Sequence, residues 1–242
     1  MRFALVSDIH GNEIALQEVL ADIDRIGVDE IVCLGDIATL GPRPRAVMQI
    51  LREGGYRCIM GNHDEFLLDP DLICKYTKAP SVIDAVRWCR DEMQDDDLEY
   101  LRGLAREFVL PLGCDSSLLL FHGSPRSNTE DILATTSSVE LDLLLDGRIA
   151  TVMAGGHTHI QMLRQHRGSL IVNPGSVGMP FKDYAAGRTP TVLDHAEYAT
   201  IDEVDGAISV TLRRLPLDRK ALREAAAASA PPVRDLLASH YL

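Results

Sequence analysis

Gly61-Asn62-His63-Asp64 is the stretch of this chain with the densest set of side chains that could bind a metal ion. An amide, an imidazole and a carboxylate stand side by side directly after a short apolar run, Tyr56 to Met60. A sharp turn that presents three such polar groups next to a buried strand is costly unless the groups bind something. This stretch is therefore the first candidate for a functional site.

Four further stretches place ligand-type side chains at the ends of apolar runs. They are Asp8-Ile9-His10, Gly35-Asp36, Phe121-His122-Gly123 and Gly156-His157-Thr158-His159. Oxygen ligands mixed with imidazoles suit Mn²⁺, Fe²⁺, Zn²⁺ or Co²⁺ better than Ca²⁺, which prefers oxygen ligands alone. Seven or more ligand-type side chains are too many for one tetrahedral site. They match two ions that share a bridging carboxylate and leave positions open for water and substrate.

Each stretch also has an ordinary structural interpretation when it is taken alone. Asp8-Ile9-His10 could begin a helix, Gly35-Asp36 could be a turn, and Asn62 could cap a helix. The pair His157 and His159 could lie on the surface, although alternation in an extended segment would put both side chains on one side. Five such stretches in order at strand ends favour a shared metal site.

Two successive βαβ units are predicted to bring the first three stretches together. Strands are expected at 3–7, 30–34 and 56–60, with a helix from Asn12 to Gly27 between the first two and a helix from Pro44 to Gly54 between the last two. The repeat is close to the ~30 residues of one βαβ unit. Parallel strands put their carboxyl ends at one edge of the sheet, so Asp8, Asp36 and Asn62 should meet there.

The remainder of the chain is predicted to continue as one α/β domain, 1–242. A helical insertion is expected at about 65–107, followed by a hairpin of 108–112 and 117–121 about Gly113-Cys114-Asp115. A helix from Ser137 through Leu145, strands at 149–154, 161–165 and 169–172, and a hairpin of 198–202 and 208–214 should come next. The Ala-rich helical tail from about 219 is expected to lie on the surface or to be partly mobile.

Composition limits the classes of function. With 242 residues, 46% hydrophobic and 25% charged, the chain can bury a full core. The formal charge of −12 disfavours an extended nucleic-acid surface, which needs clustered Lys and Arg. We expect no signal peptide and no membrane span. Five cysteines without a C-x-x-C pair indicate reduced thiols in a cytoplasmic protein.

The five stretches, in this order, resemble the calcineurin-like metallophosphoesterase superfamily. The resemblance extends from Asp8 to about Asp202 and is closest to the small bacterial and archaeal phosphoesterases, which carry a segment similar to Asn173-Pro174-Gly175-Ser176-Val177-Gly178. It implies two packed mixed β-sheets flanked by helices, a four-layer α/β/β/α sandwich, with the metals at one edge. It also implies a metal-dependent hydrolase that cleaves a small phosphomonoester, phosphodiester or nucleotide through attack by a metal-bridging hydroxide.

By the same resemblance, each ligand-type residue has an expected role. Asp8, His10 and His159 would bind one metal ion; Asn62, His122 and His157 would bind the second; and Asp36 would bridge them. His63 would face the substrate without binding metal, and Asp64 would orient it. Two divalent ions are implied, with Mn²⁺ favoured over Fe, Zn, Co or Ni.

Some positions depart from the pattern of these relatives. Thr39-Leu40-Gly41-Pro42 lacks an aromatic residue that small relatives often carry, which argues against stacking of a base or aryl group from that segment. His195 stands where relatives often have arginine, and it is expected, with His166 and His240, at the solvated surface. Arg43, Arg126 and Arg188 are candidate phosphate contacts or plain surface charges, and the sequence leaves both open.

Two other functions remain in view. The first is a scaffold of the same fold that binds a protein partner and has weak or no activity; such a scaffold need not keep His63 and the whole ligand set, which are present here. The second is a nuclease, which the acidic balance disfavours. The expected partner is a small-molecule phosphoester, and a homo-oligomer is possible.

Overall fold

Two five-stranded mixed sheets form the centre of the protein. The computed structural model describes residues 1–113, 115–185 and 187–241, with side chains described up to residue 238. The first sheet has the order β10 (Ala207–Pro216), β9 (His195–Val204), β1 (Arg2–Val6), β2 (Glu30–Cys33) and β3 (Arg57–Cys58). The second has the order β4 (Phe108–Gly113), β5 (Ser116–Leu120), β6 (Val152–Ala154), β8 (Ser169–Asn173) and β7 (Met162–His166). Expectations for Cys114 and for the side chain of His240 lie outside the described residues.

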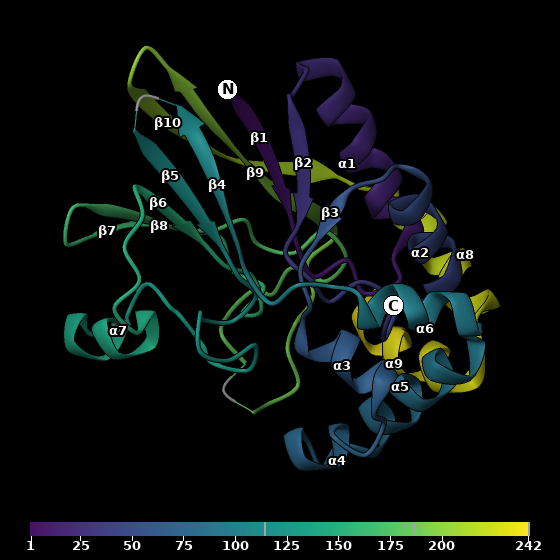
Figure 1. Ribbon diagram of the computed structural model, residues 1–242. Coiled ribbons are helices and arrows are strands. Elements are labelled where there is room, and N and C mark those ends of the chain that lie inside the picture. Colours follow the sequence, from purple (N-terminus) through teal and green to yellow (C-terminus); the bar gives the residue numbers. More distant parts are fainter. Residues whose placement is uncertain (114, 186, 242) are drawn as a thin grey trace.

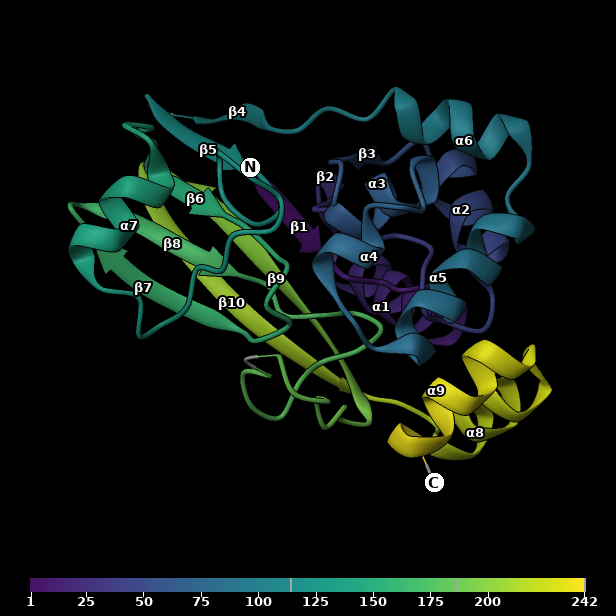
Figure 2. The same ribbon diagram turned by 90° about the horizontal axis from the view of Figure 1, so that it is seen from below.

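Helices cover the outer faces of both sheets, as Figures 1 and 2 show. On the first sheet's side lie α1 (Glu13–Ile26), α2 (Pro44–Glu53), α3 (Asn62–Leu68), α4 (Ile73–Tyr76), α5 (Pro80–Glu92), α6 (Asp95–Arg102), α8 (Arg219–Ala228) and α9 (Pro231–Tyr241). On the second sheet's side lies α7 (Ser138–Leu145). The expected four-layer α/β/β/α sandwich is therefore confirmed.

Strand β1 shows how the sequence builds these layers. Phe3 and Leu5 pack into the apolar layer between the two sheets, whereas Ala4 and Val6 pack into the layer between the first sheet and the helices. This alternation follows from the two-residue period of a strand. Both faces are buried because helices cover one and the second sheet covers the other.

The predicted βαβ units are present. Strand β1 pairs in parallel with β2, and β2 pairs in parallel with β3. Asn12 caps α1, with its side-chain oxygen accepting a hydrogen bond from the N–H of Ala15 (3.1 Å). The carboxyl ends of the three strands consequently lie at one edge of the sheet.

Several predicted boundaries are wrong because apolar runs extend beyond the residues that pair. Strand β3 covers only Arg57–Cys58, and Ile59 makes just an isolated bridge to Ala105. Ile149, predicted to lie in a strand, is 90% exposed, and β6 begins only at Val152. Hydrophobicity alone predicted these residues, whereas pairing with neighbouring strands decides where a strand ends.

The C-terminal segment is more firmly packed than the sequence indicated. Leu222 and Ala226 of α8 and Val233 and Leu237 of α9 are buried in the core between the helices and the first sheet. Pro231, predicted to interrupt the tail, begins α9, where its missing N–H is not needed. The two helices pack against each other, and α9 also packs against α5. The tail is therefore part of the helical layer.

Candidate metal centre

All five ligand-bearing stretches meet at the edge where the strands of both sheets end. The loop after β1 lies against the loop after β2, because the N–H of Asp8 donates to the carbonyl of Gly35 (3.0 Å) and the N–H of His10 to that of Asp36 (3.0 Å). The loop after β6 joins them, since the N–H of His157 donates to Oδ2 of Asp8 (3.0 Å). Residues far apart in sequence thus converge as expected.

Five of the seven predicted ligands have a left-handed backbone. The φ angles are 52° at Asp8, 47° at His10, 57° at Asp36, 67° at His157 and 58° at His159. Such a conformation is uncommon for residues other than glycine and costs roughly 1–3 kcal/mol in strained cases. The strain is concentrated where the chain turns sharply off each strand to aim a side chain into the cluster.

The first group of candidate ligands comprises Asp8, His10, Asp36 and His159. One ligand atom from each lies within 4.8 Å of the others, and all four residues are buried. Nε2 of His159 is 3.3 Å from Oδ1 of Asp8 and 3.1 Å from Nε2 of His10. Nε2 of His10 lies 3.7 Å from Oδ2 of Asp36. The ring nitrogens and carboxylate oxygens therefore face a common point.

The second group comprises Asp36, His122 and His157, which satisfy the same 4.8 Å criterion. Asn62 belongs beside it, because its Oδ1 is 3.1 Å from Nε2 of His122. Oδ2 of Asp36 is 3.4 Å from the same nitrogen. Asp36 is common to both groups, which is the position that a bridging carboxylate requires.

Backbone carbonyls fix the orientation of two of the imidazoles. Nδ1 of His122 donates to the carbonyl of Leu34 (2.6 Å), and Nδ1 of His159 donates to that of Met179 (2.7 Å). In both rings Nε2 is left to face the cluster. This second hydrogen bond is how metal-binding histidines are usually held.

The two carboxylates remain charged although they are buried. Burial by itself would raise the pKa of Asp8, but His159 and His122 lower it to about 2. Burial would likewise raise the pKa of Asp36, and His122 and His63 hold it well below its usual range. Conversely, Asp36 and Asp8 outweigh burial and raise the pKa of His122 to about 10. The centre thus attracts positive charge strongly.

Asp64 does not have the role that the resemblance implied. Its Oδ2 accepts hydrogen bonds from the N–H groups of Asp36 and Gly61 (2.9 Å each), and its Oδ1 accepts one from Ile37 (2.9 Å). Both oxygens are therefore engaged by backbone amides rather than by the ring of His63. Asp64 clamps the loop after β2 to the start of α3, so the expectation that it orients His63 directly is wrong.

Thr39 occupies the place that had been expected for Asp64. Its Oγ1 lies 2.9 Å from Nδ1 of His63 and 3.2 Å from Nδ1 of His10, and all three residues are buried. Sequence reasoning missed this residue, although it stands only three positions after Asp36. Its signal was weak, because threonine is not a typical ligand and the two histidines that it joins are far apart in sequence.

The network around Thr39 assigns the protons. The pKa of His10 and that of His63 are lowered, mainly by burial, so both rings are neutral. With Nε2 of His10 bound to a metal ion, its proton would lie on Nδ1 and be donated to Thr39. The hydroxyl of Thr39 then donates to Nδ1 of His63. The proton of His63 is consequently on Nε2.

Asp131 is a second residue that the sequence did not reveal. Its Oδ1 lies 3.5 Å from Nε2 of His157, and its Oδ2 accepts a hydrogen bond from the hydroxyl of Tyr184 (2.6 Å). It comes from the long loop between β5 and α7, which shows no regular pattern in the sequence. An acidic residue in such a loop has no distinguishing feature until the fold places it beside His157.

The arginines that were considered for phosphate contacts have other partners. Arg43 pairs with Glu13 (2.8 Å), Arg126 pairs with Glu130, and Arg188 donates to the carbonyl of Ala185 (3.3 Å). These contacts support the alternative that they are surface charges.

Two other histidines are not solvated as expected. His166 is buried and 2.8 Å from Asp142, and the half-buried His195 is 2.9 Å from Glu197. Both pair with a carboxylate, which the sequence did not indicate.

The donor set fits a pair of divalent cations. Oδ1 of Asp8 is buried without a hydrogen-bond partner among the described residues, and it faces Nε2 of His159 and of His122. Two buried carboxylates opposed by imidazole nitrogens are the mixed oxygen and nitrogen environment that Mn²⁺, Fe²⁺ and Zn²⁺ accept. Close packing leaves little room for other side chains, because a Cβ on Gly61 would lie 2.2 Å from Oδ1 of Asp36.

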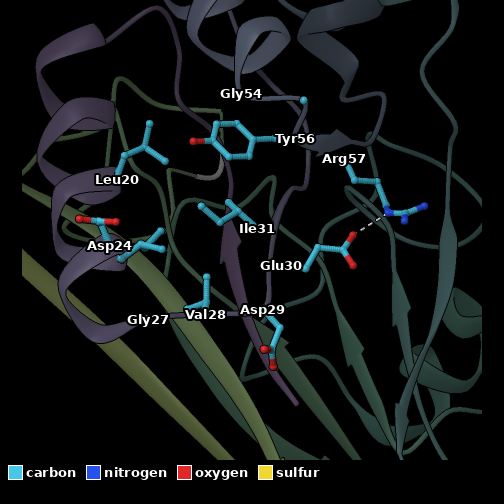
Figure 3. Close-up of a pocket in the computed structure, with 12 residues that line it drawn as sticks. Leu20, Asp24, Gly27, Val28, Asp29, Glu30, Ile31, Gly54, Tyr56 and Arg57 are labelled. Atoms are coloured by element: carbon cyan, nitrogen blue, oxygen red, sulfur yellow. Dashed lines mark hydrogen bonds and ion pairs between the residues drawn. The ribbon is translucent and has the colours of Figure 1, made fainter.

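A surface hollow of about 750 Å³ lies away from this centre (Figure 3). It is lined by the C-terminal ends of α1 and α2 and the first residues of β2, including Leu20, Ile31 and Tyr56 together with Asp24 and Asp29. These residues are at the amino ends of the parallel strands, the edge opposite the cluster. Ligands of α/β folds bind at the carboxyl ends, so we assign no role to this hollow.

The fold and the cluster together define the class of protein. A sequence profile of the calcineurin-like phosphoesterase superfamily domain matches residues 1–197, so the chain belongs to this superfamily. The resemblance identified from the five stretches is confirmed. Among the described residues, no helix is both long and apolar enough to cross a membrane.

Two individual relatives share 26% and 31% of their aligned residues with this chain. The uncharacterized protein MJ0912 of Methanocaldococcus jannaschii is 26% identical over 223 residues, which are 86% of this chain and 85% of that protein. A symmetrical bis(5'-nucleosyl)-tetraphosphatase of Janthinobacterium sp. is 31% identical over 139 residues, 56% of this chain and 48% of that enzyme.

Two solved structures are similar over almost the whole length. A metallophosphoesterase from Sphaerobacter thermophilus has a TM-score of 0.75 and 25% identity and covers 98% of this chain and 99% of its own. The hypothetical protein PH1004 from Pyrococcus horikoshii has a TM-score of 0.81 and 19% identity, with 98% and 97% covered. The first structure is that of a metallophosphoesterase. The second, at 19% identity, supports the assignment of the fold alone.

Proposed function

We propose that this protein is a phosphoesterase that uses two divalent metal ions to hydrolyse a small phosphomonoester, phosphodiester or nucleotide. Mn²⁺ is the favoured metal. The observation that carries the proposal is the position of Asp36 between two groups of buried ligands drawn from both sheets. The match to the phosphoesterase profile and the partial similarity to a tetraphosphatase support the same class of reaction. A cytoplasmic location is supported by the free thiols of Cys33, Cys58, Cys74 and Cys89.

The protein's own residues account for binding and orientation. Asp8, His10 and His159 would hold one ion, Asn62, His122 and His157 the other, and Asp36 would contact both. Two such ions polarise the phosphoryl group and lower the pKa of a water molecule towards neutrality. The left-handed turns and the clamp formed by Asp64 keep the seven side chains in place before substrate arrives.

His63 is proposed to protonate the leaving oxygen. Its ring lies beside the cluster, 5.0 Å from the His10 ring between centroids. With Nδ1 accepting from Thr39, the Nε2–H of the neutral ring can donate a hydrogen bond to the ester oxygen. Full transfer of a proton to that oxygen requires the imidazolium form of His63, which is left as the neutral ring. Such a proton transfer typically contributes ~10²–10⁴-fold to the rate.

Metal analysis followed by a panel of aryl and alkyl phosphoesters tests this function on three variants. His63→Ala should lower kcat by ~10²–10⁴-fold with metal content retained. Asp36→Asn should lose both metal and activity, more than replacement of any single terminal ligand, because both ions lose their common anion. His195→Ala, a change at a histidine paired with Glu197, serves as the control.

Two results would count against the proposal. Equal turnover by the wild type and His63→Ala would remove the role of His63. A metal-loaded wild type that hydrolyses no phosphoester would favour the alternative, a scaffold of this fold that binds a protein partner.

A further inference from the structure

Solvent reaches the metal centre from the side of His63 and His157. These are the most exposed of the predicted site residues, at 7% and 8%, whereas Asp8, Asp36 and His122 are almost completely buried. The side bordered by these two imidazoles is therefore the part of the centre nearest to solvent. Side chains that border them decide what part of the substrate, beyond the phosphoryl group, meets the protein.

Tyr76 stands on this side of the centre. Its ring centroid lies 6.3 Å from that of His63 and 6.3 Å from that of His157. The tyrosine is the last residue of α4 and is 49% exposed. A single exposed aromatic residue is ordinary on a protein surface. This one is informative because it borders both histidines at the approach to the site.

The ring of Tyr76 also lies next to a buried aromatic ring. Phe66 of α3 is buried, with its centroid 5.5 Å from that of Tyr76 and 5.0 Å from that of His63. A ring that is held in this way loses little conformational freedom when a ligand packs on its open face.

A second tyrosine lies nearby. Tyr184 is 37% exposed, and its hydroxyl is anchored on Asp131, which also neighbours His157. Partial burial is the main cause that raises the pKa of Tyr76, and the charges of Asp36 and Asp131 and the neighbouring Tyr184 raise it further. The hydroxyl of Tyr76 is therefore neutral. The two rings and the carboxylate form the mouth of the site, defined here as Tyr76, Asp131 and Tyr184.

The segment that carries an aromatic residue in small relatives cannot supply one here. Leu40 stands in that segment, and its side chain is buried in the apolar layer between the first sheet and the helices. An aromatic surface at the mouth therefore comes from the helical segment 62–102 and from the loop after β8.

We propose that Tyr76 stacks on a planar ring of the substrate, so that the substrate class is a phosphoester whose alcohol carries a nucleobase or an aryl group. This inference rests on the proposed function. The ring of Tyr76 lies 6.3 Å from the rings of His63 and of His157 between centroids, so a base joined to the phosphoryl group through a ribose could extend to it. Stacking on an aromatic side chain accepts any base, because every base presents a planar π face.

Adenosine 5'-monophosphate and ribose 5-phosphate make the test, because they share the same leaving oxygen and differ in the planar ring. The measured quantity is the ratio of their kcat/KM values in the metal-loaded protein. Tyr76→Ala should lower this ratio roughly five- to a hundredfold, the range found when stacked aromatic residues are removed. Tyr76→Phe should keep the ratio. Tyr56→Ala, at the opposite edge of the sheet, controls for loss of a tyrosine elsewhere in the fold.

The outcomes separate this inference from the proposed function. If the wild type cleaves both compounds and Tyr76→Ala leaves the ratio unchanged, the stacking role is overturned while phosphoester hydrolysis stands. If the wild type cleaves neither compound but hydrolyses p-nitrophenyl phosphate, adenosine and ribose are compared as inhibitors, and equal inhibition overturns the inference. If it cleaves none of these three monoesters and no aryl phosphodiester either, the proposed function and the inference both fail.

Discussion

At the scale of single residues, the chemistry depends on which groups form hydrogen bonds with each side chain of the site. By the resemblance, Asp64 was expected to orient His63, its neighbour in the sequence. In the fold, adjacent residues of the first turn of α3 point in different directions, so Asp64 binds backbone amides while Thr39 reaches His63. A contact from the loop after β2 therefore replaces the contact that the resemblance had implied.

Thr39→Val removes the hydroxyl at nearly constant volume and tests this arrangement. Nδ1 of both His10 and His63 would lose a partner, which should lower the free energy of unfolding by about 1–3 kcal/mol. The kcat of the metal-loaded variant should fall about tenfold or more, because the proton of His63 is no longer fixed on Nε2. Thr39→Ser should retain most activity. A Thr39→Val protein with wild-type kcat would contradict the proposed proton arrangement.

At the scale of elements, α1 is tied to the edge of the first sheet by one buried carboxylate. Oδ2 of Asp22 on α1 accepts hydrogen bonds from the hydroxyl of Tyr198 on β9 (2.6 Å) and from Nε of Arg213 on β10 (2.8 Å). Burial would raise the pKa of Asp22, but these two partners lower it below its ordinary value. The contact links an element near the N-terminus to the long hairpin near the C-terminus.

Asp22→Asn should reduce the free energy of unfolding by about 1–3 kcal/mol at pH 7, because Arg213 loses its charged acceptor. Since the pKa of Asp22 is lower in the folded than in the unfolded state, its contribution is present above about pH 4 and is lost as the pH falls through the folded pKa. The difference between wild type and variant should therefore shrink as the pH falls below about 4. Urea unfolding at several pH values measures it. The exposed Asp24→Asn on the same helix is the matched control, and a pH-independent difference would contradict the assignment.

At the scale of the whole molecule, the centre joins the two sheets. Asp8, His10, Asp36 and Asn62 follow strands of the first sheet, whereas His122, His157 and His159 follow strands of the second. Metal ions held by both sets would link the sheets in the folded state and would have no such site in the unfolded chain.

Metal binding should therefore raise the melting temperature. At a free Mn²⁺ concentration of about 100 times the dissociation constant, the gain is about 2.7 kcal/mol, or roughly 5–10 °C for a domain of this size. Thermal melts with Mn²⁺ and with a chelator measure the shift, and Asp36→Asn should show a much smaller one. Identical melting temperatures in both conditions would argue against metal binding in this fold.

The sequence by itself determined the fold class, the two βαβ units and the convergence of Asp8, Asp36 and Asn62. It could do so because hydrophobic periodicity and the direction of parallel strands are local properties with a fixed spatial consequence. The five ordered stretches likewise marked the family before any contact was known.

Only the tertiary structure decided the contacts between segments that no local pattern connects. The hydroxyl of Thr39 between His10 and His63, the position of Asp131 beside His157 and the place of Tyr76 at the mouth each depend on how separate loops pack. The same packing buried one face of the C-terminal helices and ended β3 after two residues. Such outcomes follow from non-local packing and pairing, which the order of residues along one segment does not specify.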